Sequence, residues 1–154
     1  MHKFIRNILI ALGFVALIST FAPAGLCDVY VREYRTGSRV LELDGHFIKD
    51  YRTGARKLEI RGRHVRDYKT GRILFEMDGR YIRDYRTGKR LIEIDGGYIR
   101  DYRTGKRLLE ADGKYLRDYR TGARKYELSG SGDGLDGLSA VQEFAILYCA
   151  EHYR

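Results

Sequence analysis

Apolar and polar residues alternate in short runs along most of this 154-residue chain, and the same run returns every 17 residues from Val29 to Gly130. Each copy keeps a Tyr, a Thr-Gly pair, a Glu and a closing Gly at fixed offsets. The six copies cover residues 29–45, 46–62, 63–79, 80–96, 97–113 and 114–130. Self-similarity of this kind predicts a repeat architecture in which neighbouring units share one core.

The clearest unit, RYIRDYRTGKRLIEIDG at 80–96, has the pattern of a β-hairpin. Residues 81–85 alternate and are rich in aromatic and β-branched side chains, which predicts a half-buried strand. The RTG triplet at 86–88 predicts a three-residue loop that ends in a left-handed Gly. Residues 89–94 form the expected return strand, and the DG pair at 95–96 predicts a two-residue loop into the next unit.

Turn chemistry and alternation together specify a strand register. The predicted pairs are Tyr85 with Lys89, Ile82 with Ile92, Asp84 with Arg90, Ile94 with Gly97, and Ile92 with Ile99. One face of each unit is then apolar and forms the predicted core. Its members are Val31, Leu41, Leu43, Ile48, Leu58, Ile60, Val65, Phe75, Met77, Ile82, Ile92, Ile94, Ile99, Leu109, Ala111, Leu116, Tyr126 and Leu128.

The opposite face carries Tyr81, Arg83, Tyr85, Leu91 and Glu93 in the same unit, and we expect it to face water. Glu93 is placed to pair diagonally with Arg83 across the strands. An open sheet of twelve strands would expose two edges and an apolar face, whereas closure removes both problems. We therefore expect an all-β fold, with six 17-residue hairpins in a closed, radially arranged meander shaped like a flower or barrel.

The chain after the repeats predicts one helix. Residues 131–138 have the composition of a linker, and 139–154 form the expected C-terminal helix, which Ser139 and Gln142 open as a capping box. Apolar residues from Val141 to Ala150 cover nearly every side of it. Such a helix must be buried on all sides. It is expected to pack on or inside the ring of hairpins; docking to a partner or a membrane is the alternative.

Residues 1–24 have the layout of a signal peptide, and the repeat domain then spans 25–130. Lys3 and Arg6 precede an apolar stretch, and Ala22-Pro23-Ala24 supplies small residues for cleavage near Ala24. Export to the periplasm or the extracellular space is the expected outcome. The alternative is an uncleaved membrane anchor, because Ile8–Leu26 lacks charged residues over nearly the length that spans a bilayer.

The chain is basic, with a formal net charge of +8, or +6 once the charges of Lys3 and Arg6 are removed with the signal peptide. A moderate positive charge favours anionic partners such as glycans, cell-wall polymers or lipid head groups. Nucleic acid is not expected as the partner of an exported protein. Two cysteines, Cys27 and Cys149, lie at the two ends of the mature chain. An oxidising compartment favours a disulfide between them, and cleavage after Cys27 would instead leave Cys149 as a buried thiol.

The tandem hairpins, such as GYIRDYRTGKRLLEADG, followed by a short apolar helix resemble the bacterial β-flower proteins. These are small, often exported proteins with hairpins arranged around an axis, named for four- or five-fold symmetry, whereas this chain has six units. The resemblance covers Val29 to about Arg154 and implies no enzymatic activity. A weaker resemblance links Asp84–Leu91 to the tyrosine-aspartate (YD) repeats of large secreted toxin and adhesion shells.

The sequence offers no motif for catalysis, a cofactor or a metal: it has no phosphate-binding glycine loop, no CxxC and no histidine pair at metal spacing. His46, His64 and His152 are isolated, and acidic residues that recur in every unit indicate a structural role. We therefore expect no enzymatic activity and no cofactor. The expected role is a structural or interaction module of the cell envelope.

The repeated surface is the remaining candidate for function, as a binding module for anionic polymers or glycans. One expected ring is aromatic: Tyr34, Tyr51, Tyr68, Tyr85, Tyr102 and Tyr119. A second ring is basic and lies on the same face: Arg32, Lys49, Arg66, Arg83, Arg100 and Arg117. A third ring lies at the hairpin tips and is the preferred anion-binding set: Arg35, Arg52, Lys69, Arg86, Arg103 and Arg120. The alternative for the first two rings is that tyrosines stack and cations pair with acidic residues to hold the sheet.

Overall fold

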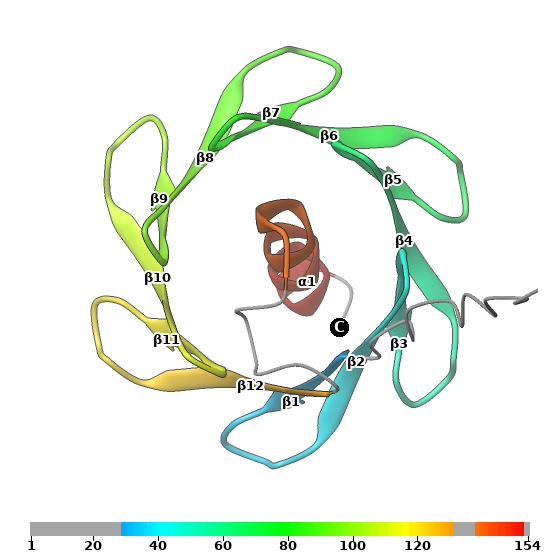
Figure 1. The fold of residues 1–154 in the computed structure, drawn as a ribbon, viewed down its shortest axis with the longest axis vertical. Coiled ribbons are helices and arrows are strands. Elements are labelled where there is room, and N and C mark those ends of the chain that lie inside the picture. The colour runs from blue at the N-terminus through cyan, green and yellow to red at the C-terminus, as the bar shows by residue number, and fades with distance from the viewer. Residues whose placement is uncertain (1–28, 131–137, 153–154) are drawn as a thin grey trace, which may run out of the picture.

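The computed structural model describes residues 29–130 and 138–152. Twelve strands form one closed antiparallel barrel in which every strand pairs with its neighbours in the chain and β1 pairs with β12. A single helix lies inside the ring, and six loops project outward around it (Figure 1). The elements are β1 Val29–Glu33, β2 Arg39–Asp44, β3 Phe47–Asp50, β4 Arg56–Arg61, β5 His64–Asp67, β6 Ile73–Asp78, β7 Tyr81–Asp84, β8 Arg90–Asp95, β9 Tyr98–Asp101, β10 Arg107–Asp112, β11 Tyr115–Asp118, β12 Arg124–Gly130 and α1 Ala140–His152.

The predicted all-β fold of six hairpins with one C-terminal helix is confirmed. Each unit contributes two strands, and the outward loops seen in Figure 1 are the hairpin tips. Because the chain runs up and down, all six tips lie at one end of the barrel, which we call the tip end. The loops between units lie at the other end, which we call the inter-unit end.

The tip loops are one residue longer than predicted. The Asp84 N–H donates to the Lys89 carbonyl at 2.9 Å and the Gly88 N–H donates to the Asp84 carbonyl at 2.8 Å, so four residues form the loop. A β-bulge compensates the change, because Arg83 pairs with Arg90 while Ile82 still pairs with Ile92. The predicted Tyr85–Lys89 and Asp84–Arg90 pairs are therefore wrong, and the Ile82–Ile92 pair is confirmed.

The loops between units begin one residue later than predicted. Asp95 pairs with Tyr98, and Ile94 pairs with Ile99, so the Ile94–Gly97 and Ile92–Ile99 pairs are wrong. In most units the first loop residue is a Gly with positive φ, such as Gly79 at 61°, and the second loop residue does not have a positive φ. That pattern is typical of a type II′ turn, which forms between Gly and the residue after it. The shift is two places in register, and two places keep every side chain on its predicted face.

The apolar face of the repeats lines the barrel interior, as predicted. All eighteen predicted core residues are either buried or packed against the buried cluster. Ile48, Leu58, Val65, Ile82 and Leu116 have no exposed surface. These side chains belong to the buried cluster in the barrel interior, and their burial provides the main apolar stabilisation of the ring.

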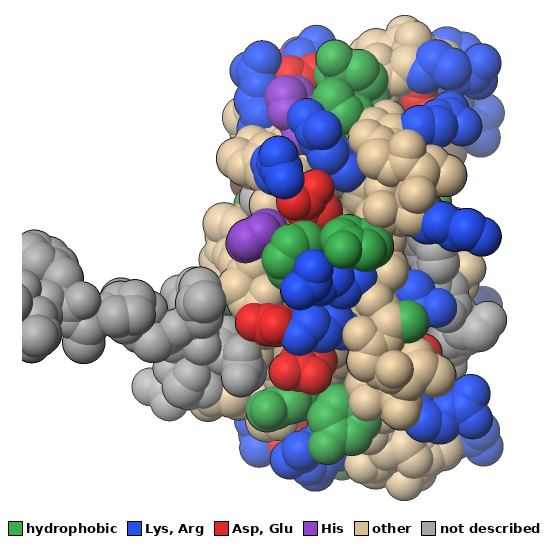
Figure 2. All heavy atoms as spheres, turned by 90° about the vertical axis from the view of Figure 1, so that its right-hand side faces the viewer, with side chains coloured by type: hydrophobic (Ala, Val, Ile, Leu, Met, Phe, Trp, Pro, Cys, Tyr) green, Lys and Arg blue, Asp and Glu red, His purple; other side chains and the backbone are tan. Residues whose placement is uncertain are grey.

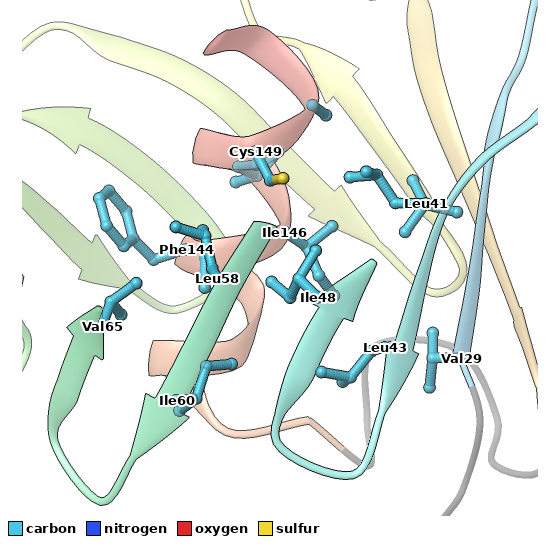
Figure 3. Close-up of a cluster of buried hydrophobic side chains, with 14 of the residues drawn as sticks. Val29, Leu41, Leu43, Ile48, Leu58, Ile60, Val65, Phe144, Ile146 and Cys149 are labelled. Carbon is cyan, nitrogen blue, oxygen red and sulfur yellow. The ribbon is translucent and has the colours of Figure 1, made fainter. Parts of the chain in front are cut away.

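α1 occupies the interior, which confirms the predicted internal position. Ile146 and Cys149 are fully buried beside the strands that carry Ile48 and Leu58 (Figure 3). Gln142 Oε1 accepts a bond from the Ser139 N–H at 2.9 Å, which is one half of the predicted capping box. The Ser139 hydroxyl donates to the same oxygen at 2.8 Å. Across residues 29–130 and 138–152, no helix is long and apolar enough to cross a membrane.

Candidate functional site

The six tyrosines of the predicted aromatic ring form edge-on contacts between neighbouring units. Tyr102, for example, meets Tyr81 of the preceding unit with ring centroids 5.4 Å apart and an interplanar angle of 84°. The other contacts have the same geometry, at 5.6 to 5.8 Å: Tyr30–Tyr51, Phe47–Tyr68, His64–Tyr85, Tyr98–Tyr119 and Tyr34–Tyr115. The last of these joins the sixth unit to the first, so the aromatic contacts run around the whole barrel. Edge-on packing of this kind stabilises a sheet.

In five of these six aromatic contacts, an arginine stacks on one ring and donates a hydrogen bond to the hydroxyl of the other. Arg90 lies 4.1 Å above the Tyr81 ring and donates to the Tyr102 hydroxyl at 3.4 Å. The equivalent donors are Arg39, Arg56, Arg107 and Arg124, at 3.0 or 3.1 Å from the next tyrosine hydroxyl. We call each set an arginine clamp. In the third unit Ile73 takes the place of the arginine, beside His64.

The sequence pattern had predicted that Arg90 pairs with Asp84. The clamp explains why that pair does not form. The bulge turns Arg90 to the outer face, where cation–π contact and a hydroxyl acceptor are available. Sequence reasoning missed the clamp. Its signal is the constant spacing of twelve residues between arginine and tyrosine in four of the five clamps; the fifth joins Arg124 to Tyr34 where the barrel closes.

Five of the six cations in the second ring form ion pairs between neighbouring strands; within the described ranges the sixth, Arg66, forms none. Arg83 lies 3.3 Å from Glu76 and 3.6 Å from Asp78, and Arg100 lies 3.4 Å from Asp95. The related pairs are Arg32–Glu127, Lys49–Asp44 and Arg117–Asp112. The predicted diagonal Glu93–Arg83 pair is wrong, because Glu93 pairs with Arg80 at 3.0 Å. This ring therefore has a structural use within the sheet.

The tip cations differ from the other two rings. Arg35, Arg52, Lys69, Arg86, Arg103 and Arg120 are all exposed, and we call them the basic rim. For the described residues, no hydrogen bond or ion pair joins a rim side chain to the rest of the chain. Figure 2 shows Lys and Arg side chains gathered along the edge of the ring. The rim is thus the repeated set of charges that remains available to a partner.

Each tip loop is held by the acidic residue at its base. Asp84 Oδ1 accepts from both the N–H and the hydroxyl of Thr87, each at 2.7 Å. The same arrangement occurs at Asp50, Asp67, Asp101 and Asp118. In the first unit Glu33 accepts from the Thr36 hydroxyl at 2.8 Å. These bonds give the recurring acidic residues a structural role in the turn, and they fix the backbone that carries each rim cation.

The loop carboxylates make the protein sensitive to acid. Hydrogen bonds from Thr87 lower the pKa of Asp84, and bonds from the equivalent threonines lower the pKa of Asp50, Asp101 and Asp118. A depressed pKa contributes stability above the unfolded value of about 4, and that contribution is lost as the pH falls through the folded pKa. We expect melting temperatures to be flat near neutral pH and to fall below roughly pH 4.

Replacing these four aspartates by asparagine should flatten the acid limb of a melting curve series measured by circular dichroism. The variant should also melt at a lower temperature at neutral pH, because the charge-assisted bonds are lost. Asp44 and Glu127 also have lowered pKa values, caused by hydrogen bonds from Lys49 and Lys114. An unchanged acid limb would assign the effect to those two ion pairs instead of the tip loops.

The bulge also moves one residue of each unit from the outer face to the barrel mouth. Val40 and Leu74 pack against the core, while Leu91 and Leu108 border a cavity beside α1. The prediction that Leu91 lies on the wet outer face is therefore wrong. The bulged strand has two residues opposite one, and the extra residue turns toward the opening at the tip end.

Cys149 is a buried free thiol on α1, and burial raises its pKa to about 12. Its predicted disulfide partner, Cys27, lies outside the described residues, so the Cys27–Cys149 bridge stays a prediction. The signal peptide at 1–24 and most of the linker at 131–138 also lie outside them. Within the ranges that the structure covers, no group of three His, Cys, Asp or Glu side chains is arranged to hold a metal ion.

The geometry defines a closed twelve-strand barrel of hairpin repeats with a central helix and a rim of unpaired cations at one end. Comparison of the chain with protein-family models, with curated proteins and with solved structures finds no match. Assignment to the β-flower proteins or to the tyrosine-aspartate repeats therefore stays a prediction.

Proposed function

We propose that the protein is an exported, non-enzymatic interaction module of the cell envelope that binds an anionic glycan polymer through its basic rim. The observation that carries the proposal is the difference between the three repeated rings. The tyrosines and five of the six cations of the second ring are engaged in aromatic contacts and ion pairs, while no hydrogen bond or ion pair is formed by a rim side chain within the described residues.

The arrangement of the rim suits a polymer. The tips project outward around the ring, so a flexible chain can reach one tip after another (Figure 1). Each contact between a rim cation and an exposed anion is worth only about 0.2 to 1 kcal/mol. Several such contacts on one polymer add up through their high effective concentration. The proposal therefore predicts binding that depends on the number of rim cations and on salt.

Support for export and for a non-enzymatic role comes from the sequence. The segment around Lys3, Arg6 and Ala24 has the layout of a signal peptide. The resemblance to β-flower proteins implies no enzymatic activity. The recurring carboxylates are also engaged, since the acidic residue at the base of each tip loop accepts bonds from the loop.

The test is retention of the mature protein on immobilised heparin, used as a probe for sulfated glycans, across a series of salt concentrations. We expect binding at low salt that is lost as the salt rises, because screening weakens exposed ion pairs. A variant with serine at all six rim positions should not bind. Salt-insensitive binding, or full binding by that variant, would refute the proposal.

A matched pair of variants separates rim contacts from overall charge. Serine at Arg86, Arg103 and Arg120 removes three rim charges; the control variant places serine at three cations of the inter-unit end, Arg63, Arg80 and Lys114. The control cations pair with Glu76, Glu93 and Glu127. The rim variant should lose about tenfold or more in affinity, and the control much less. Equal losses of affinity in the two variants would mean that net charge alone governs binding. Retention of the protein on anionic vesicles, and not on heparin, would mean that the rim binds lipid head groups.

A further inference from the structure

α1 does not fill the barrel evenly. Within the ring it packs against β2, β3, β4 and β5. On the other side an apolar cavity of about 360 Å³ separates the helix from β8, β9 and β10. Its walls include Ile92, Ile99 and Leu109 from the barrel and Phe144, Leu147 and Tyr148 from the helix. A second space of about 410 Å³ lies at the inter-unit end of the same side.

Residue size accounts for part of this asymmetry. Ala111 takes the place that Leu43, Ile60 and Leu128 hold in other units, so the fifth unit presents less volume to the helix. Ile92, Ile94 and Leu109 are only partly buried, while their counterparts on β2 and β4 are buried. Apolar side chains are thus left at a space large enough for a small ligand.

The cavity opens at the tip end beside two exposed leucines. Leu91 and Leu108 are 38% and 37% exposed, and apart from the tyrosines of the tips they are the only exposed large apolar side chains in the described ranges. The polar residues at this opening are Asp101, Glu151 and His152. The combination is an apolar chamber with a polar mouth.

The charge of the mouth is negative. Asp101 and Glu151 are acidic, and none of the described residues that line this cavity is a Lys or Arg, whereas arginines border the two other openings at the same end. The C-terminal end of α1 adds the negative end of the helix dipole. Hydrogen bonds from Thr104 lower the pKa of Asp101, so it is ionised at neutral pH. The mouth therefore favours a cation.

Asp101 retains capacity for a ligand. Its Oδ1 accepts from the N–H of Thr104 at 2.8 Å and from the hydroxyl at 2.7 Å. A carboxylate offers about four acceptor positions, so further donors can be bound. Glu151 is already bound to Lys125 at 2.8 Å and to the Tyr126 hydroxyl at 3.0 Å. Asp101 is thus the favoured contact for a positively charged group.

We propose that this cavity binds a small amphiphile with an unbranched apolar body and a protonated amine. The apolar body lies between α1 and β8–β10, against Leu109 and Phe144. The ammonium group lies at the mouth and donates to Asp101. This site is independent of the basic rim, which takes anions, so the two proposals can fail separately.

Isothermal titration calorimetry of the full chain with octylamine and octanoate, which differ in head-group charge, tests the site. Octylamine should bind with an affinity at least tenfold higher than octanoate. In the series hexylamine, octylamine and decylamine, each methylene should tighten binding about fourfold, because each is removed from water in the cavity. Equal affinity for the amine and the carboxylate would overturn the charge assignment, and absence of binding by all four compounds would overturn the site.

The repeats supply matched variants. Asp101→Asn should weaken octylamine binding about tenfold, while Asp50→Asn, which alters the same loop bonds in a unit that does not border the cavity, should leave it unchanged. Leu109→Phe places the residue that the third unit holds at this position as Phe75, and it should fill the cavity and abolish binding. Folding of each variant is checked by its melting curve. Equal effects of the two Asp variants, or unchanged binding by folded Leu109→Phe, would overturn the proposal.

Discussion

Replacing Ile146 by Asp is expected to unfold the protein, because it places a carboxylate at the centre of the barrel. Ile146 is 1% exposed and belongs to the cluster that includes Ile48 and Leu58 (Figure 3). No buried polar or charged residue lies in that core, within the described ranges, to receive the charge. A buried carboxylate without a partner costs several kcal/mol, and the lost packing of Ile adds about 2 to 5 kcal/mol. Together these costs approach the total stability of a small domain, about 5 to 15 kcal/mol.

The measurement is a urea titration followed by circular dichroism, with dye binding as a probe of exposed apolar surface. The Ile146→Asp variant should bind the dye and lack a cooperative transition in urea. Ile146→Val is the control, and it should unfold cooperatively with a loss of about 1 kcal/mol. A cooperative transition of Ile146→Asp close to that of the control would contradict the internal position of α1.

The faces of the sheet could be predicted from the sequence because they depend only on alternation. The tip loop proved one residue longer than predicted and the inter-unit loop begins one residue later, yet Ile82, Ile92 and Ile94 still point inward. The bulge absorbs the first difference, and the second moves the register by an even number of places. Side-chain alternation has a period of two, so a register error of two residues leaves the same side chains in the core.

Contacts that depend on the bulge could not be predicted in the same way. An extra residue at Leu91 turns Arg90 outward to Tyr102 and brings Leu91 itself to the barrel mouth. The sequence alone offered a simpler three-residue loop, which would have left Arg90 facing Asp84. The choice between the two loops depends on the bonds that Asp84 makes to Thr87, and these exist only once the turn has formed.

The off-centre position of α1 could not be predicted from the sequence. A helix that is apolar on most sides is expected to be buried, but its sequence does not indicate which strands of the barrel it packs against. The helix packs against β2, β3, β4 and β5, and Phe75 of β6 contacts Phe144 and Tyr148, at 5.1 and 4.6 Å, at the border of the cavity. Ala111 borders the space of about 410 Å³ at the inter-unit end of the opposite side, so that space reflects a difference in side-chain volume between units that share one repeat pattern.

The closure of the ring predicts a second large effect, at the seam between β1 and β12. The N–H of Tyr34 donates to the Lys125 carbonyl at 2.9 Å, and antiparallel bonds alternate along a strand, so the N–H of Arg32 also points across the seam toward Glu127. Replacing Arg32 by Pro removes that donor and with it one hydrogen bond of the ladder, which a strand inside a sheet does not tolerate. The same substitution at Arg83 removes the equivalent bond between β7 and β6.

The two proline variants should differ in their assembly even where their losses of stability are similar. A short loop at Gly79 connects β6 to β7, so these strands remain neighbours when one bond is lost. The seam has no such loop, because its two strands lie at opposite ends of the repeat array, and closing it has the highest loop entropy in the fold. Opening the seam exposes two unpaired edges, which favour pairing with another chain. We therefore expect Arg32→Pro, and not Arg83→Pro, to form larger species with rising concentration in size-exclusion chromatography.

Arg32→Ala and Arg83→Ala control for the lost ion pairs and should elute as the wild-type protein does. Identical elution of the two proline variants at every concentration would show that the seam is no weaker than the other strand boundaries.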